Sequence, residues 1–502
     1  KSVIMQNTNN NPKRKSATKS DKLFSYVFPV NEKAATTFSS KVSDVYNASE
    51  NFVKNEVKNF KANPKGKLVI ISSITLLVSA AVLMYFLESS FESFNAERLS
   101  TTFGKFFFGL TLTLIAFKLL FFYYTEYLYF KYKPIASVTD EELPTCTVIV
   151  PAYNEGELVW HTLKSLANSD YPKEKLQLLA IDDGSKDDTW QWMLKAKQLL
   201  GDRLTIFQQP ENRGKRQALY RGFQIGTGEV FVTVDSDSIV KTNTLRNLVS
   251  PFVVNPDCGA VAGNVKVLNN GKALIPKMLN VSFVFSFEFV RSAESMFGSV
   301  LCTPGALAAY KREAVFNCLP EWINQKFMGK ASDIGEDRAM TNMILKQGFK
   351  VLFQRNAHVL TNVPETYKGL YKMFIRWGRS NVRENLSMIS YVFNNFRKDS
   401  KFGTRLLFTD QMIKMVMTYP AILFMLYFII THPVLFVAAT LFSILLLSSV
   451  QVFFYAKRYS VSESFWAYSY GLLFAFGLFW ITPYAIATAG KSGWLTRELT
   501  VN

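Results

Sequence analysis

The stretch CTVIVPAYNE (residues 146–155) decides the fold, because a continuous apolar run ends directly in polar and acidic residues. LQLLAIDDGS (176–185) and EVFVTVDSDS (229–238) repeat this pattern further along the chain. Apolar runs of this length are typical of strands that are buried on both faces of a sheet. Amphipathic segments separate them, so the sequence predicts an α/β domain with a mostly parallel sheet.

Each of these predicted strands ends in polar or acidic side chains. Ligands of parallel sheets bind beyond the carboxyl ends of the strands, so the three ends are expected to meet at one site. In VDSDS, two carboxylates two residues apart can bind one Mg²⁺ or Mn²⁺, although a strand-to-helix turn with a capping Asp has the same pattern. The three ends carry Tyr153, Asn154 and Glu155, then Asp182 and Asp183, then Asp235 and Asp237.

Two of these stretches offer groups for a nucleotide ligand. The carboxylates of Asp182 and Asp183 can accept hydrogen bonds from a base edge or a ribose, or they can form a turn with Gly184. In ENRGKRQAL, Lys215 and Arg216 can bind a diphosphate, or they can lie on a solvated helix terminus.

Two later stretches suggest an acceptor side and a base. The small residues of CTPGALAAY (302–310) allow a ligand to approach Cys302 and Gly305, although a packed turn would use them as well. In SDIGEDRAMTN (332–342), Asp337 can act as a general base that Glu336 and Arg338 orient or tune. A plain helix N-terminus also favours these acids.

Composition points to a membrane protein. Charged residues make up 19% of the 502 residues, below the quarter or so of soluble proteins. The net charge of +18 suits nucleic-acid binding or cytoplasmic Lys and Arg beside a bilayer, and the long apolar runs favour the bilayer. Four Cys without metal-ligand spacing exclude a disulfide scaffold and predict reduced thiols, and three His make a His-based metal site unexpected.

Long apolar runs predict membrane spans. Residues 68–87 and 106–130 are each long enough to cross a bilayer, with Lys118 and Glu126 facing protein or the interface. Three more runs follow near 412–431, 433–456 and 464–490. Basic flanks predict a cytoplasmic N-terminus and a cytoplasmic domain after residue 131, in a multi-pass protein of the plasma (inner) membrane.

The remaining segments are polar or amphipathic. Residues 38–61 have apolar side chains at helical spacing, which suits either a helix on the membrane face or a solvated helix. Residues 367–404 mix aromatic and basic side chains, which predicts interfacial helices. No signal peptide is recognised, and the start at Lys1 suggests that the natural N-terminus lies upstream.

The motifs VPAYNE, IDDGS, RGKR, VDSDS, GNVKV, SDIGEDRAMTN and RWGRSNVRE occur in this order. Together they resemble the processive family-2 glycosyltransferases, especially the hyaluronan synthase, chitin synthase and nodulation chitooligosaccharide synthase branch, over about residues 145–390. The resemblance implies a Rossmann-like GT-A domain combined with transmembrane and interfacial helices. It also implies a nucleotide-sugar donor, expected to be UDP-linked, a growing polysaccharide acceptor, Mg²⁺ or Mn²⁺, a lipid bilayer and no nucleic acid.

The resemblance also implies roles for single residues. Asp337 would be the base of an inverting displacement, with Glu336 and Arg338 beside it. Trp377 would stack on the acceptor sugar, whose pocket would include Cys302 and Gly305, and Asp237 with Asp235 would bind the metal. The nucleotide sugar would contact Ala152, Tyr153, Glu155, Asp182, Asp183, Lys215, Arg216, Asp235, Lys266 and Arg376.

The chain departs from the family pattern in three places. Met373 stands where the family's Q-x-x-R-W signature has Gln, PGAL differs from the expected hyaluronan synthase loop, and Leu495 replaces a Gly in the W-G-T-R element. The identity of the polymer therefore stays open. With three late spans that C-terminal element would lie outside, unless one segment is re-entrant or bent, with Pro483 and the 410–414 stretch as candidate breaks.

The prediction is a membrane-embedded β-glycosyltransferase that polymerises UDP-GlcNAc, with or without UDP-GlcA, and translocates the product. The alternatives are a non-processive transferase with a lipid acceptor, an alginate-type synthase that uses a GDP-activated uronic acid, and a transporter or channel with a nucleotide-sensing domain. The predicted domains are a polar, partly disordered region at 1–66, two transmembrane helices at 67–131, a GT-A domain at 132–366, interfacial helices at 367–404 and a C-terminal transmembrane region at 405–502.

Overall fold

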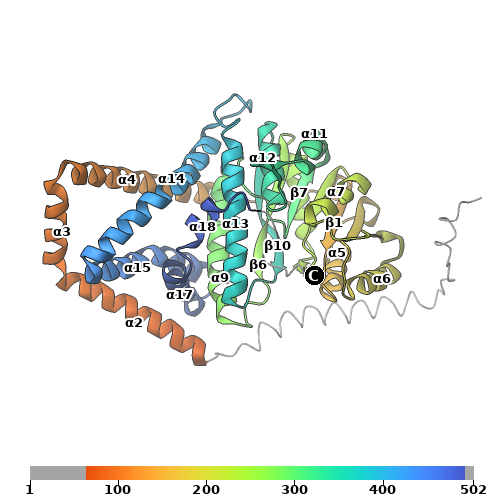
Figure 1. Ribbon diagram of the computed structural model, residues 1–502. Coiled ribbons are helices and arrows are strands. Elements are labelled where there is room, and N and C mark those ends of the chain that lie inside the picture. Colours follow the sequence, from red (N-terminus) through yellow and green to blue (C-terminus); the bar gives the residue numbers. More distant parts are fainter. Residues whose placement is uncertain (1–63, 492–502) are drawn as a thin grey trace, which may run out of the picture. The chain divides into compact units, whose positions relative to one another are not determined.

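The computed structural model describes residues 64–491 (Figure 1). The predicted polar region before residue 64, with its amphipathic segment at 38–61, lies outside these residues. The GWLTRE element at 493–498 also lies outside them.

A sheet of eight strands forms the centre of the α/β domain, in the order β3-β2-β1-β4-β7-β6-β10-β5. The pairs β1/β2, β1/β4, β2/β3 and β6/β10 are parallel, whereas β7 runs antiparallel to both of its neighbours and β5 runs antiparallel to β10. The predicted α/β class with a mostly parallel sheet is therefore confirmed. The strands are β1 (Cys146–Ala152), β2 (Leu176–Asp182), β3 (Leu204–Gln208), β4 (Val230–Thr233), β5 (Ser238–Val240), β6 (Cys258–Val267), β7 (Ala308–Lys311) and β10 (Lys350–Thr361).

Helices pack on this sheet and bury it. Every residue of β1 and β4 is buried, as expected for strands covered on both faces. Helix α7 packs on β1 and β2, and α12 packs on β6 and β10 (Figure 1). The helices of the domain are α5 (Leu158–Ala167), α6 (Thr189–Leu200), α7 (Lys215–Ile225), α8 (Thr244–Val254), α9 (Leu274–Val284), the π-helix η4 (Phe285–Val290), α10 (Arg291–Met296), α11 (Arg312–Ile323) and α12 (Glu336–Lys346).

Four described helices are long and apolar enough to cross a membrane, namely α2, α4, α14 and α15. Lys118 of α4 pairs with the buried Asp410 of α14, and Lys414 Nζ lies 2.6 Å from Asp410 Oδ2. Helix α14 runs without a break through this stretch, so 410–414 is not the break point. The bounds are α2 (Pro64–Phe86), α4 (Thr102–Lys131), α14 (Phe402–Thr431) and α15 (Pro433–Arg458), with α3 (Glu88–Ser100) between the first two.

The last apolar segment is bent. Its parts, 461–477 and α18 (Ile481–Ala487), meet at 48°, as a broken span or a re-entrant loop would. Pro483 lies in the first turn of α18, where helices tolerate proline, and the break precedes it. The first part contains α16 (Val461–Ser464), α17 (Trp466–Leu472) and the π-helix η5 (Leu473–Gly477).

Helix α13 (Tyr367–Met388) connects this bent segment to the α/β domain. It is a single amphipathic helix, and it contacts both α12 and α18. Arg383 Nε donates to the carbonyl of Ala489 at 2.8 Å, and its guanidinium also donates to Ser332 Oγ at 3.2 Å. The end of the described chain therefore lies beside the loop that precedes α12.

A buried carboxylate joins the sheet to two of the long helices. Glu288 of η4 is 1% exposed and accepts hydrogen bonds from Lys266 on β6 and from Tyr459. Arg458 Nε, at the end of α15, donates to it at 2.9 Å, and the same guanidinium donates to Tyr129 of α4. A buried charge is tolerated only with such partners.

We expect Glu288→Gln to lower the stability of the protein by about 3 kcal/mol, because Lys266 and Arg458 would then lack a buried counter-charge. Thermal unfolding in detergent measures this. Glu463→Gln is the matched control, since Glu463 is more exposed and pairs with Lys277 only at 3.7 Å. Equal melting temperatures for the two variants would contradict the prediction.

Candidate active site

The register of the sheet brings the ends of β1, β2 and β4 to one edge, as the sequence predicts. Ala152 at the end of β1 pairs with Asp182 at the end of β2, and Asp235 follows β4 on the other side of β1. The amide of Asp183 donates to the carbonyl of Ala152 at 2.8 Å. Asn154, with a φ of 52°, accepts from the amide of Lys186 at 2.9 Å. The loops after β1 and β2 are thereby fixed against each other, which brings Tyr153 and Glu155 to this edge.

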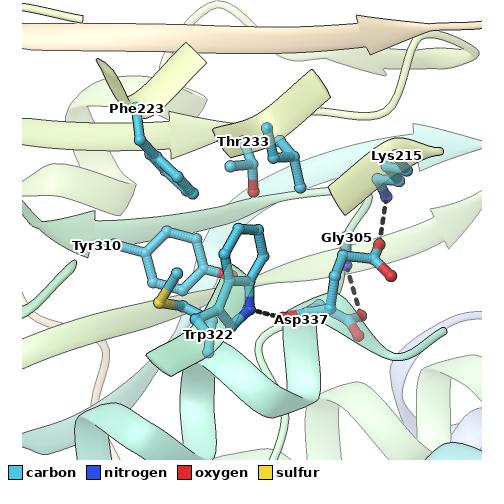
Figure 2. Close-up of a pocket in the computed structure, with 10 residues that line it drawn as sticks. Lys215, Phe223, Thr233, Gly305, Tyr310, Trp322 and Asp337 are labelled. Carbon is cyan, nitrogen blue, oxygen red and sulfur yellow. Dashed lines mark hydrogen bonds and ion pairs between the residues drawn. The ribbon is translucent and has the colours of Figure 1, made fainter. Parts of the chain in front are cut away.

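One ammonium group connects three separate elements. Lys215 is the first residue of α7, and its Nζ lies 2.5 Å from Asp235 Oδ1 and 3.1 Å from Glu336 Oε1. Figure 2 shows Lys215, Gly305 and Asp337 on one side of a small cavity, with Phe223, Tyr310 and Trp322 on the other. The cavity of about 10 Å³ has room for about one water molecule.

Asp337 is oriented by the start of α12. Its Oδ1 accepts from the amide of Arg338 at 2.7 Å, and its Oδ2 accepts from the amide of Gly305 at 3.1 Å. Gly335 precedes the helix with a φ of 72°, and a Cβ there would lie 1.9 Å from Ser380 Oγ, so only glycine fits. The side chain of Asp337 stays partly exposed, whereas Glu336 is buried.

The electrostatics of the two adjacent acids differ. Burial and the neighbouring charge of Glu336 raise the pKa of Asp337, and Lys215 and Arg376 only partly offset this. Burial also opposes the charge on Glu336, but Lys215, a backbone hydrogen bond and Arg376 together outweigh it and lower the pKa of Glu336. Paired acids with separated pKa values are typical of sites where one carboxylate exchanges a proton and the other stays ionised.

Asp182 and Asp183 hold a loop in this structure. Asp183 is buried and accepts from Gln209 Nε2 and from the amides of Arg213 and Gly214, each at 2.9 Å. Asp182 accepts from Gln208 Nε2 at 2.9 Å and from Ser185. These bonds position the loop that ends at Lys215. Direct contact of either acid with a nucleotide stays a prediction.

Asp235 and Asp237 fit a metal site whose remaining ligands water and the substrate would supply. Asp237 Oδ1 lies 3.3 Å from Thr361 Oγ1, at the junction of β5 and β10. Within residues 64–491, no group of three or more His, Cys, Asp or Glu side chains could hold an ion alone. Mg²⁺ commonly uses one or two carboxylates and takes its other ligands from water and phosphate, so this donor set suits it.

Of the predicted acceptor residues, Cys302 and Gly305 lie beside Asp337. Cys302 and Gly305 belong to the loop before β7, which Thr303 joins to α12 through a 3.0 Å hydrogen bond to Thr341 Oγ1. The charge of Arg376 on α13 is near enough to both acids to oppose the effect of burial on their pKa values. Trp377 is 39% exposed and packs on Phe283, with 6.1 Å between ring centroids.

Three predicted side chains have their hydrogen-bond partners outside this cluster. Arg216 is buried against α11, where its Nη1 donates to the carbonyl of Trp322 at 2.6 Å and its guanidinium covers the Trp322 ring. Adjacent helix residues face different directions, so Lys215 and Arg216 separate. Lys266 pairs with Glu288 and Tyr459. Arg338 turns toward Asn385 on α13, at 3.0 Å, although its amide still supports Asp337.

Sequence reasoning missed two side chains that support the cluster. Trp322 Nε1 donates to the carbonyl of Glu336 at 2.9 Å, and Gln325 Nε2 donates to the buried Glu384 at 2.8 Å. Neither lies in a recognisable motif. Their contribution depends on the packing of α11 against α12 and on the contact of Gln325 with α13, which no local pattern reports.

The chain is similar to known glycosyltransferases. Residues 144–380 match the family model described as "Glycosyltransferase like family 2". An N-acetylglucosaminyltransferase of Rhizobium meliloti is 35% identical over 248 residues, which cover 49% of this chain and 58% of the relative. An N-acetylglucosaminyltransferase of Mesorhizobium japonicum is 26% identical over 72% of this chain and 84% of the relative.

Similarity to the first of these relatives extends over only part of its length. The chain spans 58% of the Rhizobium meliloti protein. Among solved structures, a mannosyltransferase from Pyrobaculum calidifontis, in complex with GDP-Man and Mn²⁺, has a TM-score of 0.49 and 23% identity, over 76% of this chain and 96% of that one.

We expect Asp183→Asn to loosen the loop at 209–214, because an amide accepts fewer hydrogen bonds than a carboxylate and forms weaker ones. If the closed conformation of this loop loses about 1.4 kcal/mol or more of stability, tryptic cleavage after the exposed Arg213 should become at least about tenfold faster. Asp202→Asn, on an exposed turn, is the control. Unchanged cleavage at Arg213, or equal acceleration at every site, would contradict this role.

Proposed function

We propose that the chain transfers N-acetylglucosamine from a nucleotide donor to a growing glycan, because residues 144–380 match the glycosyltransferase family 2 model. The names of the relatives support the choice of sugar. The single observation that carries the proposal is the Lys215–Asp235–Glu336 cluster, with the partly exposed Asp337 beside it.

Asp337 acts as the base in the proposed reaction. Its carboxylate accepts the proton of the acceptor hydroxyl while that oxygen forms a bond to the anomeric carbon of the donor sugar. The bond from this carbon to the diphosphate oxygen breaks, and the nucleoside diphosphate leaves with the electron pair. Attack opposite the leaving group inverts the anomeric centre. The raised pKa of Asp337 suits a group that accepts a proton.

The cations at the site stabilise the leaving group. Lys215 and Arg376 lie close to the two acids and carry charge opposite to that of a diphosphate. Asp237 and Asp235 would hold Mg²⁺ or Mn²⁺, which supplies further positive charge to the diphosphate. Asp235 also pairs with Lys215, so an ion bound by Asp235 would lie near this ammonium group.

The finer assignment is a membrane-embedded polymerase. We propose a UDP-linked donor, repeated transfer to one chain, and passage of the product between helices such as α4 and α14. Four helices with the length and apolarity to cross a bilayer support this arrangement. The catalytic domain would face the cytoplasm from the inner membrane, as the basic flanks of the first two spans predict.

Purified protein in lipid nanodiscs, incubated with Mn²⁺ and radiolabelled UDP-GlcNAc, tests the function. We expect labelled oligosaccharide from the wild type and a loss of about 10²–10⁴-fold in Asp337→Asn, because the acceptor proton then has no base. Asp399→Asn is the control, since that carboxylate pairs with Lys350 away from the cluster. Full activity of Asp337→Asn, or label found only in lipid, would contradict the proposal.

A further inference from the structure

Gly305 lies where three charged groups of the candidate site approach one another. Its amide donates to Asp337 Oδ2 at 3.1 Å (Figure 2). A Cβ atom at residue 305 would lie 2.6 Å from Lys215 Nζ and 3.5 Å from Asp235 Oδ2, so the backbone runs close to both groups. Small shifts of the loop that carries Gly305 would therefore change its distances to the base and to the cation.

A buried chain of hydroxyl groups fixes this loop to α12. Thr303 and Thr341 are completely buried, and Tyr310 on β7 is 2% exposed. Thr303 Oγ1 lies 2.9 Å from the hydroxyl oxygen of Tyr310 and 2.7 Å from Thr341 Oγ1. The amide of Thr303 also donates to Thr341 Oγ1, at 3.0 Å, and this oxygen lies 2.7 Å from the backbone carbonyl of Asp337. One oxygen of α12 thus contacts both the backbone and the side chain of a loop residue.

The direction of these hydrogen bonds follows from the number of protons available. A carbonyl oxygen can only accept, so the single hydroxyl proton of Thr341 is donated to Asp337. Thr341 Oγ1 then accepts from the Thr303 hydroxyl, which in turn accepts from Tyr310. Every hydroxyl proton in the chain has an acceptor, and each bond polarises the next one. A fully satisfied buried network of this kind specifies a single arrangement of the groups that it joins.

A helix-internal hydrogen bond alone would not explain this arrangement. Threonine commonly donates to the carbonyl four residues earlier in a helix, so the contact between Thr341 and Asp337 has no special meaning by itself. The same oxygen, however, is the acceptor for the buried amide of Thr303. A valine of nearly the same shape at residue 341 would leave that amide without an acceptor, which is costly inside a protein.

We propose that Thr341 is a positioning residue for the transfer reaction, and that it acts through Thr303 to keep the Gly305 amide on the carboxylate of the base. The inference rests on the proposed function. Thr341 is completely buried, so it acts through the loop and not by contact with substrate. Misplacement of a reacting group by about 1 Å can cost about a hundredfold in rate, so an anchor two residues from Gly305 can control the reaction.

The kinetics of variants at residue 341 test this role. We expect Thr341→Val to lower kcat for transfer from UDP-GlcNAc at least about tenfold and to leave the donor KM within about twofold of wild type, because the groups proposed to bind the donor lie on other elements. Thr341→Ser keeps the hydroxyl, so its kcat should stay within about threefold of wild type.

Thr244→Val on α8 is the matched control, since Thr244 is equally buried and its hydroxyl donates to the carbonyl of His358 at 2.6 Å. Both of its kinetic parameters should stay near those of the wild type. A wild-type kcat in Thr341→Val would overturn the inference, and so would an equal loss of kcat in Thr341→Ser or in Thr244→Val. No transfer by the wild type would instead overturn the proposed function.

The reactivity of the Cys302 thiol reports the position of the loop without turnover. Burial and the nearby charge of Asp337 raise the pKa of this thiol to about 12, so the wild type should react slowly with maleimide. In Thr341→Val, and in Thr303→Val where α12 is unchanged, release of the loop should accelerate labelling of Cys302 at least about fivefold. The buried Cys318 should keep its wild-type rate. Unchanged labelling of Cys302, or equal acceleration at Cys318, would overturn the inference.

Discussion

The ion pairs of Lys215 are the interaction on which the site depends. One ammonium at the start of α7 contacts a carboxylate that follows β4 and another in the first turn of α12. None of these charges can be buried alone without a large desolvation cost, so each requires the others. The tight start of α12 at Gly335 then determines where Asp337 lies, because the two acids are adjacent in the chain.

The same cation gives the adjacent acids different properties. Lys215 contacts Glu336 directly and helps to lower its pKa, and the negative charge of Glu336 contributes to the raised pKa of Asp337. A nucleotide-sugar transferase needs such a division, since a base must accept a proton while the surrounding cations stay available to a diphosphate. Helix α13, which lies outside the sheet, contributes the positive charge of Arg376 to the site. Arg383 on the same helix donates a hydrogen bond to Ala489, near the end of the described chain.

Much of this arrangement could be predicted from the sequence, because apolar runs that end in acids define both the strands and the edge where they meet. The sequence predicts Lys215, Asp235 and Asp337 there, and the structure brings them together. The positions of Lys266 and Arg216 could not be predicted, because their partners Glu288 and Trp322 lie in other elements and no local pattern links them. The sequence predicts that Lys118 faces protein or the interface, but not which residue it contacts, because its partner Asp410 is 292 residues away. The structure also resolves the ambiguous last span as a bent pair.

The pH dependence of kcat/KM in Lys215→Met tests the central claim most directly. The pKa of Asp337 is raised by burial and Glu336, and Lys215 opposes this rise. Removal of the cation should raise that pKa further, so the acid limb of the profile should move to higher pH by about one unit or more. Lys215→Arg should keep the limb near its wild-type position. An acid limb that stays in place in Lys215→Met, or moves to lower pH, would contradict the account.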